Sequence, residues 1–342
     1  MIYGNIFCED FSANNLFDYS NPRNSDGLFT CLIVLREKLL QIGVEINTPD
    51  ININRKVSFE IHIDGRHLAN NNLPKYLIAG ENPLICTLNA DCSYLDKFHL
   101  VFSWNETALN HPRSVRIFIP NTINNISDFR RFADRTIFSC LISSNKVTPW
   151  GGVNDLYAER IKVIRWYESN APELFHLYGR GWGKPSQAFS RNDKFFRRVA
   201  RLRTQLFGHR PFPSWHGEIK IKSAILSNAK FSYCYESVKD LPNYITEKIF
   251  DSFLSGCVPI YWGADNVQEF IPANCFVDRR QFKDTAEVHR YLMGITPEKF
   301  GQLQSDISDF LRSEKAYLFS VENFATTVAG NIARDIAQNP NT

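Results

Sequence analysis

Residues 244–262, YITEKIFDSFLSGCVPIYW, place a glutamate and a lysine side by side where a helix is expected to begin. Glu247 in a first turn complements the positive end of the helix dipole, whereas Lys248 is repelled by the same field. A bound anion would remove that conflict, because the unpaired N–H groups of a helix start also bind phosphate. The pair therefore indicates either an anion-binding site or a solvated lysine at a helix start.

The helix that must position this pair is indicated by its apolar spacing. One buried stripe is expected from Ile245, Ile249, Phe250, Phe253 and Leu254. Gly256 fits the end of the helix, and residues 257–263, CVPIYWG, are typical of a buried strand. Glu247 and Lys248 thus lie in the first turn of a helix that precedes a strand.

The composition favours a globular protein that does not depend on disulfides. The 342 residues are 44% hydrophobic and 13% aromatic, and a net charge of +3 with dispersed Lys and Arg excludes nucleic acid as the main partner. The eight cysteines form no C-x-x-C pair, so we expect small core residues in a reducing compartment. Because the first twenty residues do not resemble a leader and no apolar run is long enough to span a bilayer, we expect a protein that is either cytoplasmic or peripheral at the inner face of a membrane.

Strand-like and helical stretches alternate along the chain, which predicts parallel sheets with crossover helices. Strands are expected at 57–63, 74–80, 98–104, 114–120, 135–145, 173–179, 230–236, 257–263 and 275–279. The other expected helices are at 28–43, 154–168, 193–206 and 217–229. We predict an α/β fold with an N-terminal domain at 1–134, a C-terminal domain at 135–312, and closing helices at 313–342 that return to the first domain. Ligands of such sheets gather at the carboxyl ends of the strands.

Several stretches resemble one enzyme family. Residues 230–263, KFSYCYESVKDLPNYITEKIFDSFLSGCVPIYWG, resemble the C-terminal signature of the α-1,3-fucosyltransferases, in which a KF-x-x-x-FEN strand precedes Y-[IV]-TEK and a helix. The similarity continues through residues 264–282, ADNVQEFIPANCFVDRRQF. Upstream, residues 141–167 and 174–183 resemble the family's S-N strand, Arg-bearing helix and GR strand end. Residues 79–83, AGENP, are similar to a loop of its acceptor domain.

The resemblance implies two Rossmann-like domains facing across a cleft, the GT-B fold, and an enzyme that transfers fucose from GDP-fucose to a sugar hydroxyl with inversion. By the same resemblance, Lys248 holds the diphosphate together with the helix start, and Glu247 accepts hydrogen bonds from the sugar hydroxyls of the donor. Tyr244 packs on the ribose, the base or the fucose, or else only on the helix.

Four more positions are expected to contact the donor. Arg180, followed by glycines at a strand end, is a second cation for the diphosphate unless it is simply solvated. The residues that compete for this role are Arg191 and Lys194. Asn145 faces the donor or forms a turn. Glu236 and Ser237 occupy the place of EN in the family's FEN motif, and Ser shortens a side chain that could reach the nucleotide.

The catalytic base implied by the resemblance is Glu81, which follows an expected strand and Gly80. The rival base is Asp64, which also follows a strand and precedes a glycine, and a plain surface-loop glutamate is the other interpretation of position 81. Because the sequence contains no D-x-D triplet, we expect no obligatory metal, with Mg or Mn at most stimulatory, and no other cofactor.

The expected partners are GDP-fucose and a glycan acceptor, of the surface polysaccharide or lipopolysaccharide class and in that case lipid-linked. The basic helix at 193–206 is either a solvated face or a surface for anionic lipid, which would give peripheral membrane contact. Two alternatives stay open: a GT-B transferase of another nucleotide sugar, and a noncatalytic carbohydrate-binding protein of the same fold.

Overall fold

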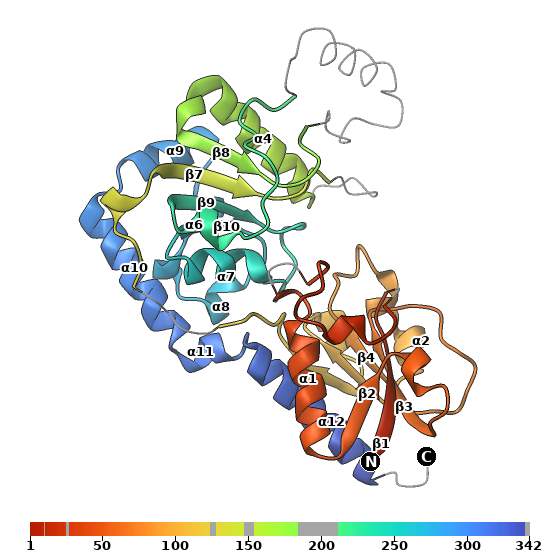
Figure 1. Cartoon of the computed structure of the whole chain (residues 1–342). Coiled ribbons are helices and arrows are strands. Elements are labelled where there is room, and N and C mark those ends of the chain that lie inside the picture. The colour runs from red at the N-terminus through yellow and green to blue at the C-terminus, as the bar shows by residue number, and fades with distance from the viewer. Residues whose placement is uncertain (10, 25–26, 124–127, 147–153, 184–210, 339–342) are drawn as a thin grey trace, which may run out of the picture. The chain divides into compact units, whose positions relative to one another are not determined.

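The computed structural model describes residues 1–342 except 10, 25–26, 124–127, 147–153, 184–210 and 339–342 (Figure 1). The chain forms two compact units. The first unit comprises Met1–Asn124, Pro242–Glu247 and Ser313–Thr342, and the second comprises Asn125–Leu241 and Lys248–Arg312. The domain limits expected from the sequence stay a prediction.

The first unit is built on six parallel strands, within the described residues, in the order β2-β1-β3-β4-β5-β6. These strands are β1 (Ile2–Phe7), β2 (Val44–Asn47), β3 (Val57–Ile63), β4 (Lys75–Ala79), β5 (Leu100–Ser103) and β6 (Ser114–Arg116). Sequence periodicity did not predict β1 or β2. β2 is only four residues long, and β1 contains Gly4, where a Cβ would lie 2.2 Å from the Phe59 ring.

Two helices from opposite ends of the chain pack together on this first sheet. These are α1 (Thr30–Gln41) and α12 (Val321–Gln338), which lie side by side in Figure 1. Leu35 and Leu39 share a buried core with Val328 and Ile332. The shorter helices of the unit are α2 (Cys92–Leu95), α3 (Glu106–Leu109) and α11 (Glu314–Tyr317). The last helix is therefore an integral part of the first unit.

The second unit contains, among its described residues, five parallel strands in the order β11-β10-β9-β7-β8. They are β7 (Ile137–Ile142), β8 (Phe175–Tyr178), β9 (Ala229–Tyr235), β10 (Val258–Trp262) and β11 (Val277–Asp278). The helices are α4 (Leu156–Asn170), α6 (Ser223–Leu226), α7 (Glu247–Leu254), α8 (Val267–Phe270), α9 (Thr285–Met293) and α10 (Pro297–Leu311). α7 begins at the last residue of the first unit.

One expected helix is largely wrong, and another cannot be compared. Of residues 217–229, only Ser223–Leu226 are helical. The preceding residues are held to β8 instead, because Leu177 and Gly179 donate backbone hydrogen bonds to Ser214 and Gly217. The expected basic helix at 193–206 lies outside the described residues, as do Arg191 and Lys194.

The cysteines confirm one expectation from composition. All eight are free, and five of them are buried: Cys8, Cys140, Cys234, Cys257 and Cys275. They serve as small core residues. Within the described ranges, none of the helices combines the length and the apolar character that crossing a membrane requires.

Candidate functional site

The second sheet brings the predicted donor-binding residues to one edge. Its strands are parallel, so their carboxyl ends meet at the same edge, where ligands of such sheets bind. Asn145 follows β7, Arg180 follows β8, and Glu236 and Ser237 follow β9. Lys248 at the start of α7 reaches this edge, since its ammonium contacts Glu236.

The loops after β7 and β8 hold each other in place. The backbone N–H of Asn145 donates to the carbonyl of Arg180 over 2.8 Å. Gly179 has a φ of +123°, and a Cβ there would lie 2.0 Å from the carbonyl oxygen of Ser143, so only glycine fits. The Arg180 side chain is 76% exposed, and its Nε lies 3.8 Å from the Oε2 of Glu218, which is 59% exposed. Such an exposed pair is weak, which leaves the guanidinium able to turn to an anionic ligand.

A buried ion pair lies at the centre of this edge. The Lys248 Nζ is 3.1 Å from the Glu236 Oε2, and the Glu236 side chain is 0% exposed while that of Lys248 is 26% exposed. The missing side chain of Gly263 makes room, because a Cβ there would lie 2.5 Å from the Glu236 Cγ. Arg160 of α4 donates to the carbonyls of Tyr235 and Glu236 over 2.6 and 2.8 Å. The carboxylate of Glu236 thus fixes the position of the Lys248 ammonium, and donor contact by Glu236 or Lys248 stays a prediction.

The helix that carries Lys248 is anchored by the stripe expected from the sequence. Ile249, Phe250 and Phe253 are completely buried. Gly256 ends the helix with a φ of +61°, as expected of a residue just past a helix end. Behind the helix, burial raises the pKa of the Cys234 thiol to about 12, so it stays protonated. The apolar packing fixes where the start of α7 points.

Ser237, the departure from the family motif, is only 4% exposed. Its carbonyl accepts a hydrogen bond from Leu156 at the start of α4. Its contact with a donor stays a prediction, as do the ligand contacts of Asn145 and Arg180.

The carboxyl edge of the first sheet carries both candidate bases, Asp64 after β3 and Glu81 after β4. Asp64 has a φ of +58°, and its Oδ1 accepts hydrogen bonds from the N–H groups of Gly80 and Glu81, both at 2.8 Å, and from the Asn89 amide at 2.9 Å. Asp64 therefore serves as the clamp of the turn that presents Glu81. The Glu81 side chain is half-buried, and its Oε1 accepts from the backbone N–H of Asn82 at 2.9 Å.

Tyr244 lies with this carboxylate in the first unit, because Pro242–Glu247 pack there. The amide of the fully buried Asn82 donates to Glu81 over 3.2 Å and to the Tyr244 hydroxyl over 3.3 Å. The Tyr244 ring is 6% exposed and lies 4.9 Å from the ring of Trp104, whose indole N–H donates to the Gly80 carbonyl. This placement differs from a ring that stacks on the donor, and donor contact by Tyr244 stays a prediction.

Sequence reasoning missed the residues that support Glu81. Asn82, Asn89 and Trp104 make the hydrogen bonds and ring contact that hold its loop. The available signals were the Asn beside Glu81 and the Trp at the end of an expected strand. Glu247 occupies the first turn of α7, as expected, and is half-buried.

Over the described stretches of the chain, no three His, Cys, Asp or Glu side chains lie close enough to bind a metal ion together. The expectation about metal ions stays a prediction.

Sequence similarity to a known family covers β9, β10 and α7, which carry Glu236 and Lys248. Residues 188–301 match the family described as glycosyltransferase family 10 (fucosyltransferase), C-terminal part. This stretch is similar to that family over about a third of the chain. Over 113 residues the chain is 31% identical to the α-(1,3)-fucosyltransferase FucT of Helicobacter pylori, a match that covers 32% of this chain and 23% of the relative. Over 67 residues the chain is 39% identical to an α-(1,4)-fucosyltransferase of Arabidopsis thaliana, a match that covers 20% of this chain and 16% of the relative. The matches thus span less than a quarter of either relative.

Structural similarity extends over nearly the whole chain. It is similar to an α1,3-fucosyltransferase solved with GDP-fucose, with a TM-score of 0.51, 15% identity, and coverage of 96% of this chain and 89% of the other. It is also similar to the Anabaena protein HepE solved with UDP and glucose, with a TM-score of 0.55, 9% identity, and coverage of 97% and 99%. At such identities the likeness concerns the fold. The two parallel-sheet α/β units are those of the GT-B class, which confirms the expected fold class.

Proposed function

We propose that this protein is an inverting fucosyltransferase that moves L-fucose from GDP-fucose to a hydroxyl of a glycan acceptor. The observation that carries the proposal is the position of the Lys248 ammonium. It lies at the start of α7, is held by the buried Glu236, and belongs to residues 188–301, which match the family 10 model. A helix start backed by a fixed cation is suited to a diphosphate. The relatives named as fucosyltransferases, and the neighbour solved with GDP-fucose, support fucose as the sugar.

The proposed reaction is a single displacement. The acceptor hydroxyl loses its proton to the Glu81 carboxylate as its oxygen forms a bond to the anomeric carbon of fucose. The bond from that carbon to the diphosphate breaks, and GDP leaves with the electron pair. Lys248, the N–H groups of the α7 start and the exposed Arg180 then share the developing negative charge. Glu247 accepts hydrogen bonds from fucose hydroxyls, which orients the ring for attack.

The choice of Glu81 over Asp64 rests on hydrogen-bond use. The Oδ1 of Asp64 accepts three hydrogen bonds that fix the turn, and a proton on that oxygen would break these hydrogen bonds. Glu81 has a half-buried carboxylate held by the neighbouring Asn82. We therefore assign proton transfer to Glu81 and positioning to Asp64. We propose no required cofactor, because cationic side chains and a helix start supply the charge that a metal would otherwise bring.

The acceptor is proposed as a glycan of the surface polysaccharide or lipopolysaccharide class. Two exposed apolar residues follow Glu81 closely, Leu84 at 45% and Ile85 at 47% exposed. Apolar side chains next to the base suit the C–H face of a sugar ring. Contact with a membrane surface stays a prediction.

The test is nucleotide release from a panel of donors. Purified protein is incubated with GDP-fucose, GDP-mannose, UDP-glucose and UDP-galactose, each with and without a mixed glycan pool, and with and without EDTA. GDP release from GDP-fucose that requires the glycan supports the proposal. Release of a different nucleotide would point to another GT-B transferase, and tight binding without release would point to a noncatalytic carbohydrate-binding protein.

A matched pair of lysine variants sharpens that test. Lys248→Ala removes the proposed phosphate contact, whereas Lys222→Ala removes a lysine of similar exposure, 27%, that pairs with Asp251 further along the same helix. We expect weaker GDP binding only in Lys248→Ala. Equal effects of the two substitutions would remove the special role of Lys248.

A further inference from the structure

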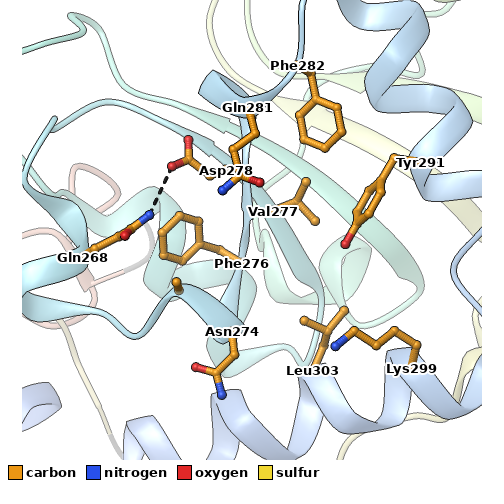
Figure 2. A pocket seen from close by; sticks show the side chains of 11 residues that line it. Gln268, Asn274, Phe276, Val277, Asp278, Gln281, Phe282, Tyr291, Lys299 and Leu303 are labelled. Atoms are coloured by element: carbon orange, nitrogen blue, oxygen red, sulfur yellow. Dashed lines mark hydrogen bonds between the residues drawn. The ribbon is translucent and has the colours of Figure 1, made fainter.

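A small pocket lies along the outer edge of β11, the terminal strand of the second sheet (Figure 2). Its volume is about 130 Å³. Its lining includes residues before β11, such as Asn274, and after it, such as Phe282, together with Tyr291 of α9 and Lys299 of α10. β10 lies between β11 and β9, the strand that leads to Glu236. The pocket is therefore separate from the ion pair described above.

The inner wall of the pocket is apolar. Phe276, Val277 and Leu303 are 4%, 5% and 4% exposed, so their side chains form a buried floor. The rings of Phe282 and Tyr291 lie beside it with centroids 5.3 Å apart. Figure 2 shows these side chains around a common open space. Such a surface accepts the flat, apolar face of a ring.

The rim of the pocket is polar and carries a positive charge. Asp278 is neutralised by Arg280, whose Nη2 lies 2.7 Å from its Oδ2, and it also accepts a weak hydrogen bond from Gln268 at 3.4 Å. The remaining polar rim groups are Asn274, Gln281, Tyr291 and Lys299. None of these four side chains donates to, accepts from or pairs with another of the described residues. In Figure 2 the Tyr291 hydroxyl and the Lys299 ammonium both point into the open space.

The size of the pocket limits its occupant to one ring. An apolar cavity of about 150 Å³ holds benzene, whereas most sites for drug-sized ligands exceed about 300 Å³. A nucleotide sugar or a peptide segment is too large. The amides, the phenol and the ammonium belong to exposed residues, and a purely apolar ring would displace part of their water without replacing its hydrogen bonds. A sugar ring presents both an apolar C–H face and a rim of hydroxyls, and the single unpaired cation favours a carboxylate on that ring.

We propose that this pocket binds an acidic monosaccharide unit of the hexuronate type, free or within a glycan. The ring packs on Phe276 and Leu303, its hydroxyls meet the amides of Asn274 and Gln281, and its carboxylate meets Lys299 and the Tyr291 hydroxyl. The site goes beyond the proposed transfer reaction, because it holds neither the donor nor the group that accepts fucose. It would retain an acidic glycan on the second unit.

The experiment measures binding to the full chain by saturation-transfer NMR in the absence of any nucleotide sugar. The ligands are glucuronate, glucose, benzoate and inorganic phosphate. We expect saturable, roughly millimolar binding of glucuronate, as befits a ligand of this size. Glucose should bind more weakly, by about fivefold, because it lacks the charge-assisted bond to Lys299. Benzoate and phosphate should bind more weakly still, since each satisfies only one part of the site.

Two variants with matched controls test the assignment. Lys299→Ala should reduce glucuronate affinity to that of glucose, and Tyr291→Ala should reduce both. The controls are Lys56→Ala and Tyr317→Ala, which remove exposed side chains of the first unit. Thermal unfolding checks that each variant folds.

Three results would overturn the proposal: no glucuronate binding at tens of millimolar, benzoate or phosphate binding as tightly as glucuronate, or glucuronate binding that neither pocket variant changes. Donor turnover is measured separately in the same variants and should be unchanged. A failure of the pocket is thereby distinguished from a failure of the proposed transferase.

Discussion

Removing the Lys248 side chain should damage two properties of the protein that can be measured separately. Lys248→Ala removes the ammonium that lies 3.1 Å from the Glu236 carboxylate, which is 0% exposed. Loss of one member of a buried ion pair costs about 3 to 5 kcal/mol of unfolding free energy. We expect the lower end, because Lys248 is 26% exposed and the pair is partly screened by water. The same substitution should weaken GDP binding, because the proposed phosphate contact is lost.

The double variant Lys248→Ala with Glu236→Gln separates these two effects. Glutamine keeps the size of the side chain and removes the buried charge, so most of the lost stability should return. GDP binding should not return, because the ammonium is still absent. Lys222→Ala is the control: its partner Asp251 is 24% exposed, whereas Glu236 is 0% exposed, so water can solvate the carboxylate that is left and a smaller loss of about 1 kcal/mol is expected.

The assays are urea unfolding followed by circular dichroism, and titration calorimetry with GDP. If Lys248→Ala is as stable as Lys222→Ala, then Glu236 does not depend on Lys248. If the double variant regains GDP binding together with stability, then the loss in the single variant came from structural damage, and Lys248 is not the phosphate contact.

Two further predictions concern the carboxyl ends of the strands of the first sheet and β8, the terminal strand of the second sheet. Glu81→Gln should abolish fucose transfer while GDP binding stays unchanged, and normal turnover by this variant would mean that another residue is the base. Asp64→Asn weakens the acceptor of three hydrogen bonds, so it should lower the unfolding free energy by about 1 to 3 kcal/mol and reduce transfer only in part. His176 has a pKa lowered by burial and by the stacked His216, 3.9 Å away, so its contribution to stability is complete above pH 6.5 and is lost as the pH falls below that value. Unfolding at a series of pH values should show this loss between about pH 7 and 5, and His176→Gln should flatten it; an unchanged pH dependence would contradict the assignment.

The supports of Glu81 illustrate why local sequence is an incomplete guide. Its position after a strand was predictable, because Gly80 and the apolar run before it act over a few residues. The supporting roles of Asn82 and Trp104 were not predictable, because both residues contact Tyr244, which is more than a hundred positions away in the chain. Such pairings are set by which backbone segments fold into the same unit.

The sequence by itself determined the local features of this protein. Apolar periodicity placed α7 and the strands β3 and β9, and the charge conflict in the first turn of α7 indicated an anion site. These signals are local because helix packing faces and helix dipoles act within a few turns.

Only the tertiary structure decided how the polar residues are used. It buried Glu236 behind Lys248, made Asp64 a clamp, and placed Tyr244 beside Trp104 in the first unit. It also held Gly217, the first residue of the helix predicted at 217–229, to β8 through the backbone N–H of Gly179. The physical reason is desolvation: whether a polar group binds a ligand or a neighbour depends on how much water distant segments remove from it.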